Sequence, residues 1–190
     1  MTQLFVWGSS HCTNYRNFPN EFEAQLIHQR RYLRPIIHAK GGQKLDSQIT
    51  SKIINTIQAN QNKPSVHLII LGDNNLRADQ TIKQVLQQFE LIIHEINQNR
   101  NSYLIISGLI YGQHPDFPLF INCDLQLKLL ARKQTNKQVI FVQVQKYLIG
   151  PQIYLDNVHL TRKGVQIFIK PLIKALKCVP NPIQPPTSLQ

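Results

Sequence analysis

Short apolar segments alternate with amphipathic segments along nearly the whole chain, and this alternation limits the possible folds most strongly. Five segments rich in valine, isoleucine and leucine are predicted to be strands: 3–7, 34–39, 66–71, 102–107 and 138–144. The third of them is almost continuously apolar, which is typical of a parallel strand that is covered on both faces.

The intervening segments carry apolar residues at steps of three and four, the period of a helix that packs on one face. Clear stripes lie within 45–57, 82–96 and 165–176, a weaker one lies within 18–26, and 119–133 completes the set. Because helices between parallel strands form right-handed crossovers, the pattern predicts an α/β fold, a three-layer α/β/α sandwich around a five-stranded parallel sheet.

The 190 residues suit one domain, which we assign to residues 1–178. Four of the last eleven residues are prolines, and no apolar period is present there. We therefore interpret residues 179–190 as a Pro-rich tail or linker, which suggests further domains in a longer parent protein.

The chain is basic, with 21 lysines and arginines against 10 acidic residues and a formal net charge of +11. Such an excess favours contact with nucleic acid or an acidic lipid surface. The cations are scattered, however, with their tightest groups at 30–34, 132–137 and 170–177, and aromatic residues do not interleave with them. An ordinary solvated basic surface is the preferred interpretation.

The compartment and cofactor predictions rest on what the sequence lacks. Its three cysteines have neither the even number of a disulfide framework nor the spacing of zinc ligands, so we expect no metal. No apolar run approaches the roughly 20 residues that cross a bilayer. We expect no transmembrane segment and a cytoplasmic protein.

Polar turns follow several of the predicted strands. They are 8–10, 41–42 and 72–75, and a fourth polar turn at 156–159 precedes the last helix. Ligands of open parallel sheets bind at the carboxyl ends of the strands, so these turns are expected to converge on one site.

Their residue types suit acyl transfer. A serine such as Ser10 needs a base, and His159 can serve if a carboxylate such as Asp156 orients its ring. Backbone N–H groups of Ser10 and Gly42 and the amide of Asn74 could stabilise an oxyanion, where losing one donor typically costs about 3–4 kcal/mol. Taken singly, each motif has an ordinary alternative: a turn, a loop, or a helix cap beside a surface histidine.

In this order and setting, Ser10, Gly42, Asn74 and His159 resemble the SGNH (GDSL-type) hydrolase superfamily. The resemblance spans roughly residues 3–177, and the Asp156–His159 block is its most specific part. It implies a flavodoxin-like strand order 2-1-3-4-5 and no metal or organic cofactor.

The same resemblance implies a serine esterase or acyl hydrolase that cleaves carboxyl or O-acetyl esters of a small acyl-ester substrate. Ser10 would be the nucleophile, His159 its base and Asp156 the residue that orients His159, while Ser10, Gly42 and Asn74 would form the oxyanion hole. Two positions depart from the family pattern, because Ser9 and Asn75 stand where aspartates are usual. Both positions normally shape turns.

Other polar residues receive structural interpretations. We expect Cys12 to be a packed thiol, His38 and His67 to be structural histidines, and His11 to face solvent. The segment 112–118, with His114 and Asp116, is predicted to be a loop that could wall the substrate site.

A binding module on the same fold, weakly active or inactive, is the alternative function, and its partner would be nucleic acid or an acidic membrane surface. A narrower resemblance concerns the SGNH-like esterase domains in first-open-reading-frame proteins of some animal non-LTR retrotransposons. This basic, Asn/Gln-rich chain with a linker-like tail is similar to them in composition.

Overall fold

The computed structural model describes residues 1–13, 24–25, 32–112, 116–150, 152–156 and 159–180. Its sheet is parallel throughout, with the order β2-β1-β3-β4-β5. The strands are β1 (Gln3–Gly8), β2 (Ile36–Ala39), β3 (Ser65–Ile70), β4 (Ser102–Ser107) and β5 (Val139–Val142). The predicted fold class and strand order are confirmed. No strand end differs from its predicted position by more than two residues.

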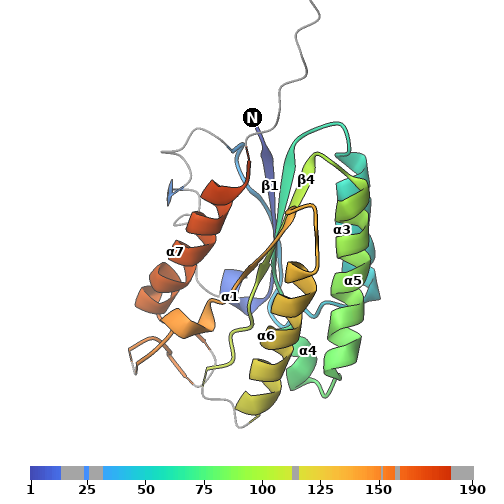
Figure 1. Cartoon of the computed structure of the whole chain (residues 1–190). Helices are drawn as coiled ribbons and strands as arrows, with labels where there is room; N and C mark the ends of the chain where they lie inside the picture. Colours follow the sequence, from blue (N-terminus) through green and yellow to red (C-terminus); the bar gives the residue numbers. More distant parts are fainter. Residues whose placement is uncertain (14–23, 26–31, 113–115, 151, 157–158, 181–190) are drawn as a thin grey trace, which may run out of the picture.

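Helices cover both faces of the sheet, so the molecule has three layers (Figure 1). One face carries α3 (Ser47–Ala59), α5 (Ile82–Gln98) and α6 (Phe117–Arg132), and the other carries α1 (Ser10–Thr13) and α7 (Arg162–Cys178). Two short helices, α4 (Asp73–Arg77) and the 3-10 helix η1 (Gln145–Tyr147), lie in the connections. Most of the helix predicted within 18–26 lies outside the described residues, and residues 24–25 are helical.

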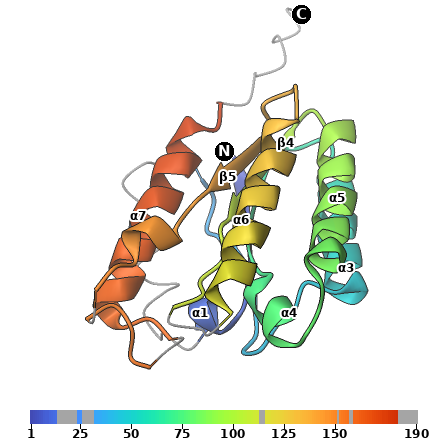
Figure 2. The ribbon, with the colours of Figure 1, turned by 60° about the horizontal axis from the view of Figure 1, so that its bottom comes forward.

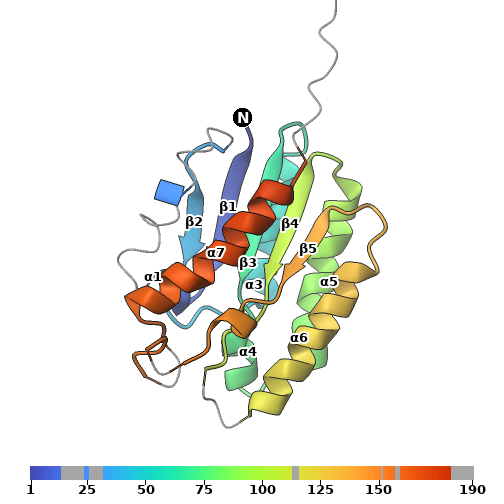
Figure 3. The same ribbon diagram turned by 60° about the vertical axis from the view of Figure 1, so that its left-hand side comes forward.

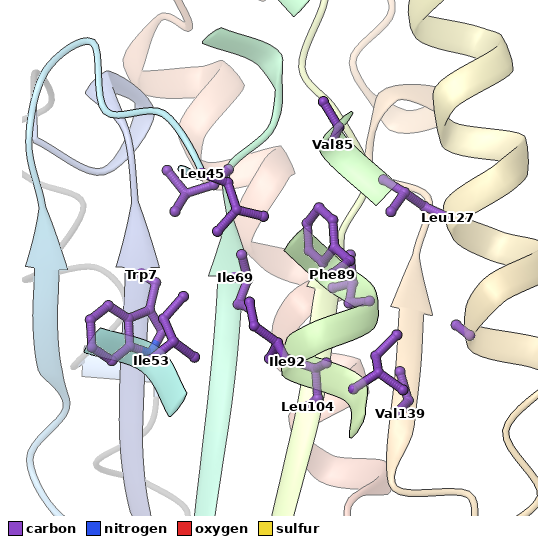
Figure 4. Close-up of a cluster of buried hydrophobic side chains, with 14 of the residues drawn as sticks. Trp7, Leu45, Ile53, Ile69, Val85, Phe89, Ile92, Leu104, Leu127 and Val139 are labelled. Atoms are coloured by element: carbon purple, nitrogen blue, oxygen red, sulfur yellow. The ribbon is translucent and has the colours of Figure 1, made fainter. Parts of the chain in front are cut away.

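Each central strand divides its side chains between two apolar cores. Leu4 and Val6 of β1 belong to the core under α7, whereas Phe5 and Trp7 belong to the core under α3, α5 and α6 (Figure 4). Because both faces are buried, the strand is apolar at successive positions rather than at alternate ones. This explains the continuous apolar runs of the sequence.

The register of the sheet aligns the ends of three neighbouring strands. Gly8, the last residue of β1, pairs with Ala39 of β2 and with Ile70 of β3. The segments that follow these three residues therefore leave the sheet at one level. This alignment positions the candidate site.

Side-chain caps set the start of three long helices. The Asp46 carboxylate accepts a hydrogen bond from the Ile49 N–H at the start of α3, and Thr81 and Gln84 form a capping box at the start of α5. At the start of α7 the Thr161 hydroxyl accepts from the Gly164 N–H at 3.0 Å. The alternative in which Asp156 caps the last helix is therefore wrong.

A buried carboxyl joins α6 to the end of β4. Asp124 is 2% exposed, and its Oδ1 accepts a hydrogen bond from the Leu109 N–H at 2.8 Å. Its Oδ2 has no hydrogen-bond partner among the described residues. Burial raises the pKa of Asp124 from 3.8 to about 7, and the Leu109 bond opposes that shift only in part.

This pKa makes stability depend on pH. The unfolded chain loses the Asp124 proton near pH 4, whereas the folded chain keeps it until about pH 7. The contribution of Asp124 to the free energy of unfolding should therefore fall by up to roughly 4 kcal/mol as pH rises from 4 to 7. Asp124→Asn should remove that part of the slope in urea unfolding series, and the exposed Asp79→Asn should not. An unchanged slope in Asp124→Asn would contradict this assignment.

Candidate active site

The proposed nucleophile stands where β1 meets α1. Ser10 is the first residue of α1 and is 8% exposed, and the Cys12 N–H donates a hydrogen bond to the Ser9 carbonyl at 2.9 Å. The turn is so tight that a Cβ on Gly8 would overlap the Cys12 side chain. Glycine at position 8 therefore allows α1 to begin directly at the strand end.

The residues beside Ser10 do not compete with it as nucleophiles. Cys12 is buried, and burial raises the pKa of its thiol far above the usual range, with the Asp73 charge adding to the effect. Its expected role as a packed thiol is confirmed. Ser9 is fully buried, and its hydroxyl has no partner among the described residues. The side chain of His11 lies outside the described residues.

The second turn brings Gly42 to the same edge. The Lys40 N–H donates to the carbonyl of Gly8 at 3.4 Å, and the Gln43 N–H donates to the carbonyl of Lys40 at 3.0 Å. Gly42 has φ +69°, a backbone conformation that glycine adopts without strain. These bonds hold the turn against the end of β1.

The third turn begins α4 and carries both asparagines. Asn74 donates through Nδ2 to the Gln43 carbonyl at 3.0 Å, so its amide is tied to the Gly42 turn. Asn75 is fully buried and bonds to both backbone groups of Leu45, accepting from its N–H at 2.8 Å and donating to its carbonyl at 2.9 Å. Asn75 therefore clamps the segment after Gly42 onto α4.

This clamp explains one departure from the family pattern. An aspartate at position 75 could accept from the Leu45 N–H but could not donate to the Leu45 carbonyl while ionised. Asparagine satisfies both groups and also donates to Gln80 Oε1 at 2.7 Å. The sequence around Asn75 gave no indication of these contacts with Leu45.

Asp156 and His159 form a direct pair. Nδ1 of His159 lies 2.7 Å from Asp156 Oδ2, and the His159 N–H donates to Asp156 Oδ1 at 2.6 Å. Because a carboxylate accepts hydrogen bonds, this contact places the ring proton on Nδ1 and leaves the lone pair on Nε2. Their side chains are 57% and 36% exposed.

Backbone contacts hold this pair against the start of α7. The Leu155 N–H donates to the His159 carbonyl at 2.7 Å, and the Thr161 N–H donates to the Ile153 carbonyl at 2.8 Å. A Cβ on Gly164 would overlap that Ile153 carbonyl, so only glycine permits this close approach. The position of His159 is thus set by residues on both sides of the turn.

Arg77 was not predicted to belong to the site. It follows Asn74 by one turn of α4, donates through Nη2 to the Ile110 carbonyl at 3.2 Å, and lies 5.2 Å from the centre of the Phe120 ring. Burial lowers the pKa of Arg77, and the charges of Asp73 and Asp156 oppose this effect. Arg77 therefore joins α4 to the segment after β4 through the Ile110 carbonyl.

The predicted site residues occupy one end of the sheet. Figures 1 and 2 show α1, α4 and the N-terminal end of α7 at the end where the strands finish. Cys12, two residues after Ser10, and Leu160, next to His159, lie in the same apolar core. No hydrogen bond joins Ser10 to His159 among the described residues, so their catalytic partnership stays a prediction.

The other predicted polar residues fall outside this group. His67 is fully buried, burial lowers its pKa to about 3, and Nε2 lies 3.2 Å from Ser65 Oγ, which confirms a structural role. His38 stacks on Trp7 with ring centroids 4.3 Å apart. Asp116 is the residue before α6, and His114 lies outside the described residues. The described residues contain no group of three metal-ligating side chains.

Comparison with known proteins gives a structural likeness only. No family model and no curated protein matches the chain by sequence. The structure resembles a member of the lipolytic protein G-D-S-L family from Veillonella parvula, with TM-score 0.76 and 13% identity over 94% of this chain and 100% of that chain.

Two further matches are carbohydrate esterases of family 3. The one from Talaromyces cellulolyticus gives TM-score 0.72 at 12% identity, covering 93% of this chain and 97% of the other. The one from Clostridium thermocellum gives TM-score 0.70 at 16% identity, covering 93% and 99%. The chain therefore has the fold of these hydrolases. None of its described helices combines the length and apolar character needed to span a membrane.

The Asn75 clamp generates a stability prediction. Asn75→Ala should leave the buried N–H and carbonyl of Leu45 without partners and lower the free energy of unfolding by about 3 kcal/mol. Asn75→Asp, which keeps the acceptor, should lose less. Chemical denaturation measures both, with the exposed Asn62→Ala as control. Equal stability of Asn75→Ala and wild type would show that the clamp does not hold the loop.

Proposed function

We propose that this protein is a serine ester hydrolase with Ser10 as nucleophile, His159 as general base and Asp156 as the residue that orients His159. The observation that carries the proposal is the 2.7 Å contact between His159 and Asp156 at the sheet edge where Ser10 begins α1. The contact supplies two members of a catalytic triad, the base and the carboxylate that orients it. Ser10 supplies the third, a hydroxyl at a tight strand-to-helix turn.

The reaction follows from these groups. His159 Nε2 takes the proton of Ser10 as Oγ forms a bond to the ester carbonyl carbon. The N–H groups of Ser10 and Gly42 and the Asn74 amide donate to the oxyanion. When the carbon–oxygen bond to the alcohol breaks, the leaving oxygen takes the proton from His159. Water, deprotonated by the same base, then releases the acid and restores Ser10.

The substrate class is an ester of a small acyl group, either a carboxyl ester or an O-acetyl group. The solved structures of similar fold are described as a lipolytic protein and as carbohydrate esterases, which supports ester chemistry without selecting an alcohol. The mechanism requires no metal or organic cofactor.

The second candidate is a binding module on the same fold, with weak or no catalysis. The observation that favours it is the net charge of +11, together with the departure at Ser9. A narrower candidate, the esterase domain of a non-LTR retrotransposon first-open-reading-frame protein, would combine ester hydrolysis with binding. The support for it is compositional: the chain is basic, rich in asparagine and glutamine, and Pro-rich at its end.

Ester hydrolysis by serine variants tests the nucleophile. Ser10→Ala should lower kcat/KM for p-nitrophenyl acetate by roughly a thousandfold or more, because residues of a triad act as a unit. Ser9→Ala is the matched control and should retain most of the activity. His159→Ala should match Ser10→Ala, and the double variant should be no worse than either single one.

Two results would contradict the proposal. One is a wild-type rate equal to that of Ser10→Ala at the background level, and the other is a rate lost in Ser9→Ala but kept in Ser10→Ala. The first would leave the binding module as the surviving candidate. The second would move the nucleophile to the neighbouring residue.

A further inference from the structure

Exposed apolar side chains gather on one part of the surface. Among the described residues, twelve large hydrophobic side chains are exposed, and eight of them lie between residues 117 and 155. This stretch is about a fifth of the chain, so the exposure is concentrated rather than scattered. Concentrated exposed apolar surface marks an interaction site more often than isolated apolar residues do.

Half of these side chains form a row along α6. Phe117, Ile121, Leu125 and Leu129 follow one another at steps of four residues and are 36% to 56% exposed. At 1.5 Å per residue, the row is about 18 Å long. Buried α6 residues such as Phe120 and Leu127 face the sheet, so α6 is apolar on two sides.

The segment from η1 to Asp156 adds a second apolar group. Tyr147, Ile149 and Leu155 are 46%, 78% and 70% exposed. Contacts through Tyr111 and Gln145 connect this segment to α6. The Tyr111 ring packs edge-on against Phe117 at 4.8 Å, its N–H donates to Gln145 Oε1, and Gln145 Nε2 lies 3.0 Å from the Tyr154 hydroxyl.

We call the row on α6 together with Tyr147, Ile149 and Leu155 the apolar face. Figure 3 shows that the chain after β5 leaves the edge of the sheet near α6 and then runs toward the N-terminal end of α7. Leu155 directly precedes Asp156 in the sequence. The apolar face therefore reaches the candidate active site.

The charge around this face is positive. Residues 117–155 contain five lysines and arginines, and the exposed Asp116 lies directly before Phe117. Between residues 117 and 155 the sole acidic residue is Asp124, which is buried. Arg132 and Lys133 are exposed at the C-terminal end of α6, and the Lys146 ammonium lies 4.8 Å from the centre of the Tyr147 ring.

We propose that the apolar face docks on a bilayer surface that carries anionic lipid headgroups. Apolar side chains flanked by lysine and arginine are the combination that binds such an interface, because the former enter the acyl boundary and the latter meet the headgroups. An aromatic ring beside a cation, as in Tyr147 and Lys146, also suits the interface.

Other occupants fit these observations less well. A second copy of the chain would bring its own Arg132 and Lys133 against the same cations, and like charges oppose such pairing. Nucleic acid would use the cations but would leave the apolar row without a role, since phosphate contacts do not need exposed leucines. A bilayer uses both features.

A corollary rests on the proposed function. If the chain is an ester hydrolase, docking through the apolar face brings Asp156 and His159 close to the membrane surface, and the ester would be presented there. The docking itself does not depend on catalysis. Binding is therefore tested without turnover, and failure of one proposal leaves the other standing.

Co-sedimentation with vesicles tests the docking. The whole chain should sediment with vesicles of phosphatidylcholine containing phosphatidylglycerol, and much less with phosphatidylcholine alone. Leu125→Ser with Leu129→Ser should lower the partition coefficient at least tenfold, because those side chains enter the bilayer. Leu91→Ser, an equally exposed leucine on α5, is the matched control and should bind like wild type.

Charge variants test the second half of the proposal. Arg132→Glu with Lys133→Glu should weaken binding by about fivefold or more for each residue, since each cation near an anionic surface contributes separately. Lys83→Glu with Arg100→Glu changes the net charge equally elsewhere and should have a smaller effect. Circular dichroism and thermal unfolding confirm that the Leu125 and Leu129 variant is folded.

Three outcomes would overturn the proposal. The first is no sedimentation of wild type with anionic vesicles at low salt. The second is binding that the serine variants of Leu125 and Leu129 leave unchanged, which would reduce the contact to charge alone. The third is a wild-type protein that does not bind vesicles but forms a dimer in light scattering, with the serine variants monomeric. This result would assign the face to a second copy of the chain.

Discussion

The register between β1 and its two neighbours is the constraint on which the rest of the structure depends. Gly8 pairs with Ala39 on one side and with Ile70 on the other, so three chain segments leave the sheet at one level. Ser10, Gly42 and Asn74 follow those residues by two, three and four positions. A slip of one residue in either pairing would separate the proposed nucleophile from its oxyanion donors.

Polar contacts maintain this arrangement beyond the sheet. Asn75 ties the segment after Gly42 to α4, and Arg77 ties α4 to the segment after β4 through the Ile110 carbonyl. The residue at position 75 departs from the SGNH pattern without loss of hydrogen bonds, because asparagine satisfies both backbone groups of Leu45. The departure at Ser9 differs, since its buried hydroxyl lacks a partner among the described residues.

The sequence predicted the fold because apolar periodicity reports burial directly. Strands buried on both faces are continuously apolar, and the helix stripes show one buried side, so the layers followed from the pattern, while the strand order came from the resemblance to SGNH hydrolases. The roles of Asn75, Arg77 and Asp124 could not be predicted, because each depends on contacts between segments far apart in the sequence. The same holds for the apolar face, since the leucines of α6 have no signature that separates exposed from buried ones.

The central claim is that Ser10 is a nucleophile activated by His159. Mass spectrometry after reaction with a fluorophosphonate tests it most directly, because the reagent reacts rapidly with a serine that a base activates and slowly with an ordinary serine. The tryptic peptide that ends at Arg16 contains both Ser9 and Ser10, so fragment ions must locate the adduct. The account predicts one adduct, on Ser10, that is absent in His159→Ala. An adduct on Ser9, or none in the folded wild-type protein, would contradict it.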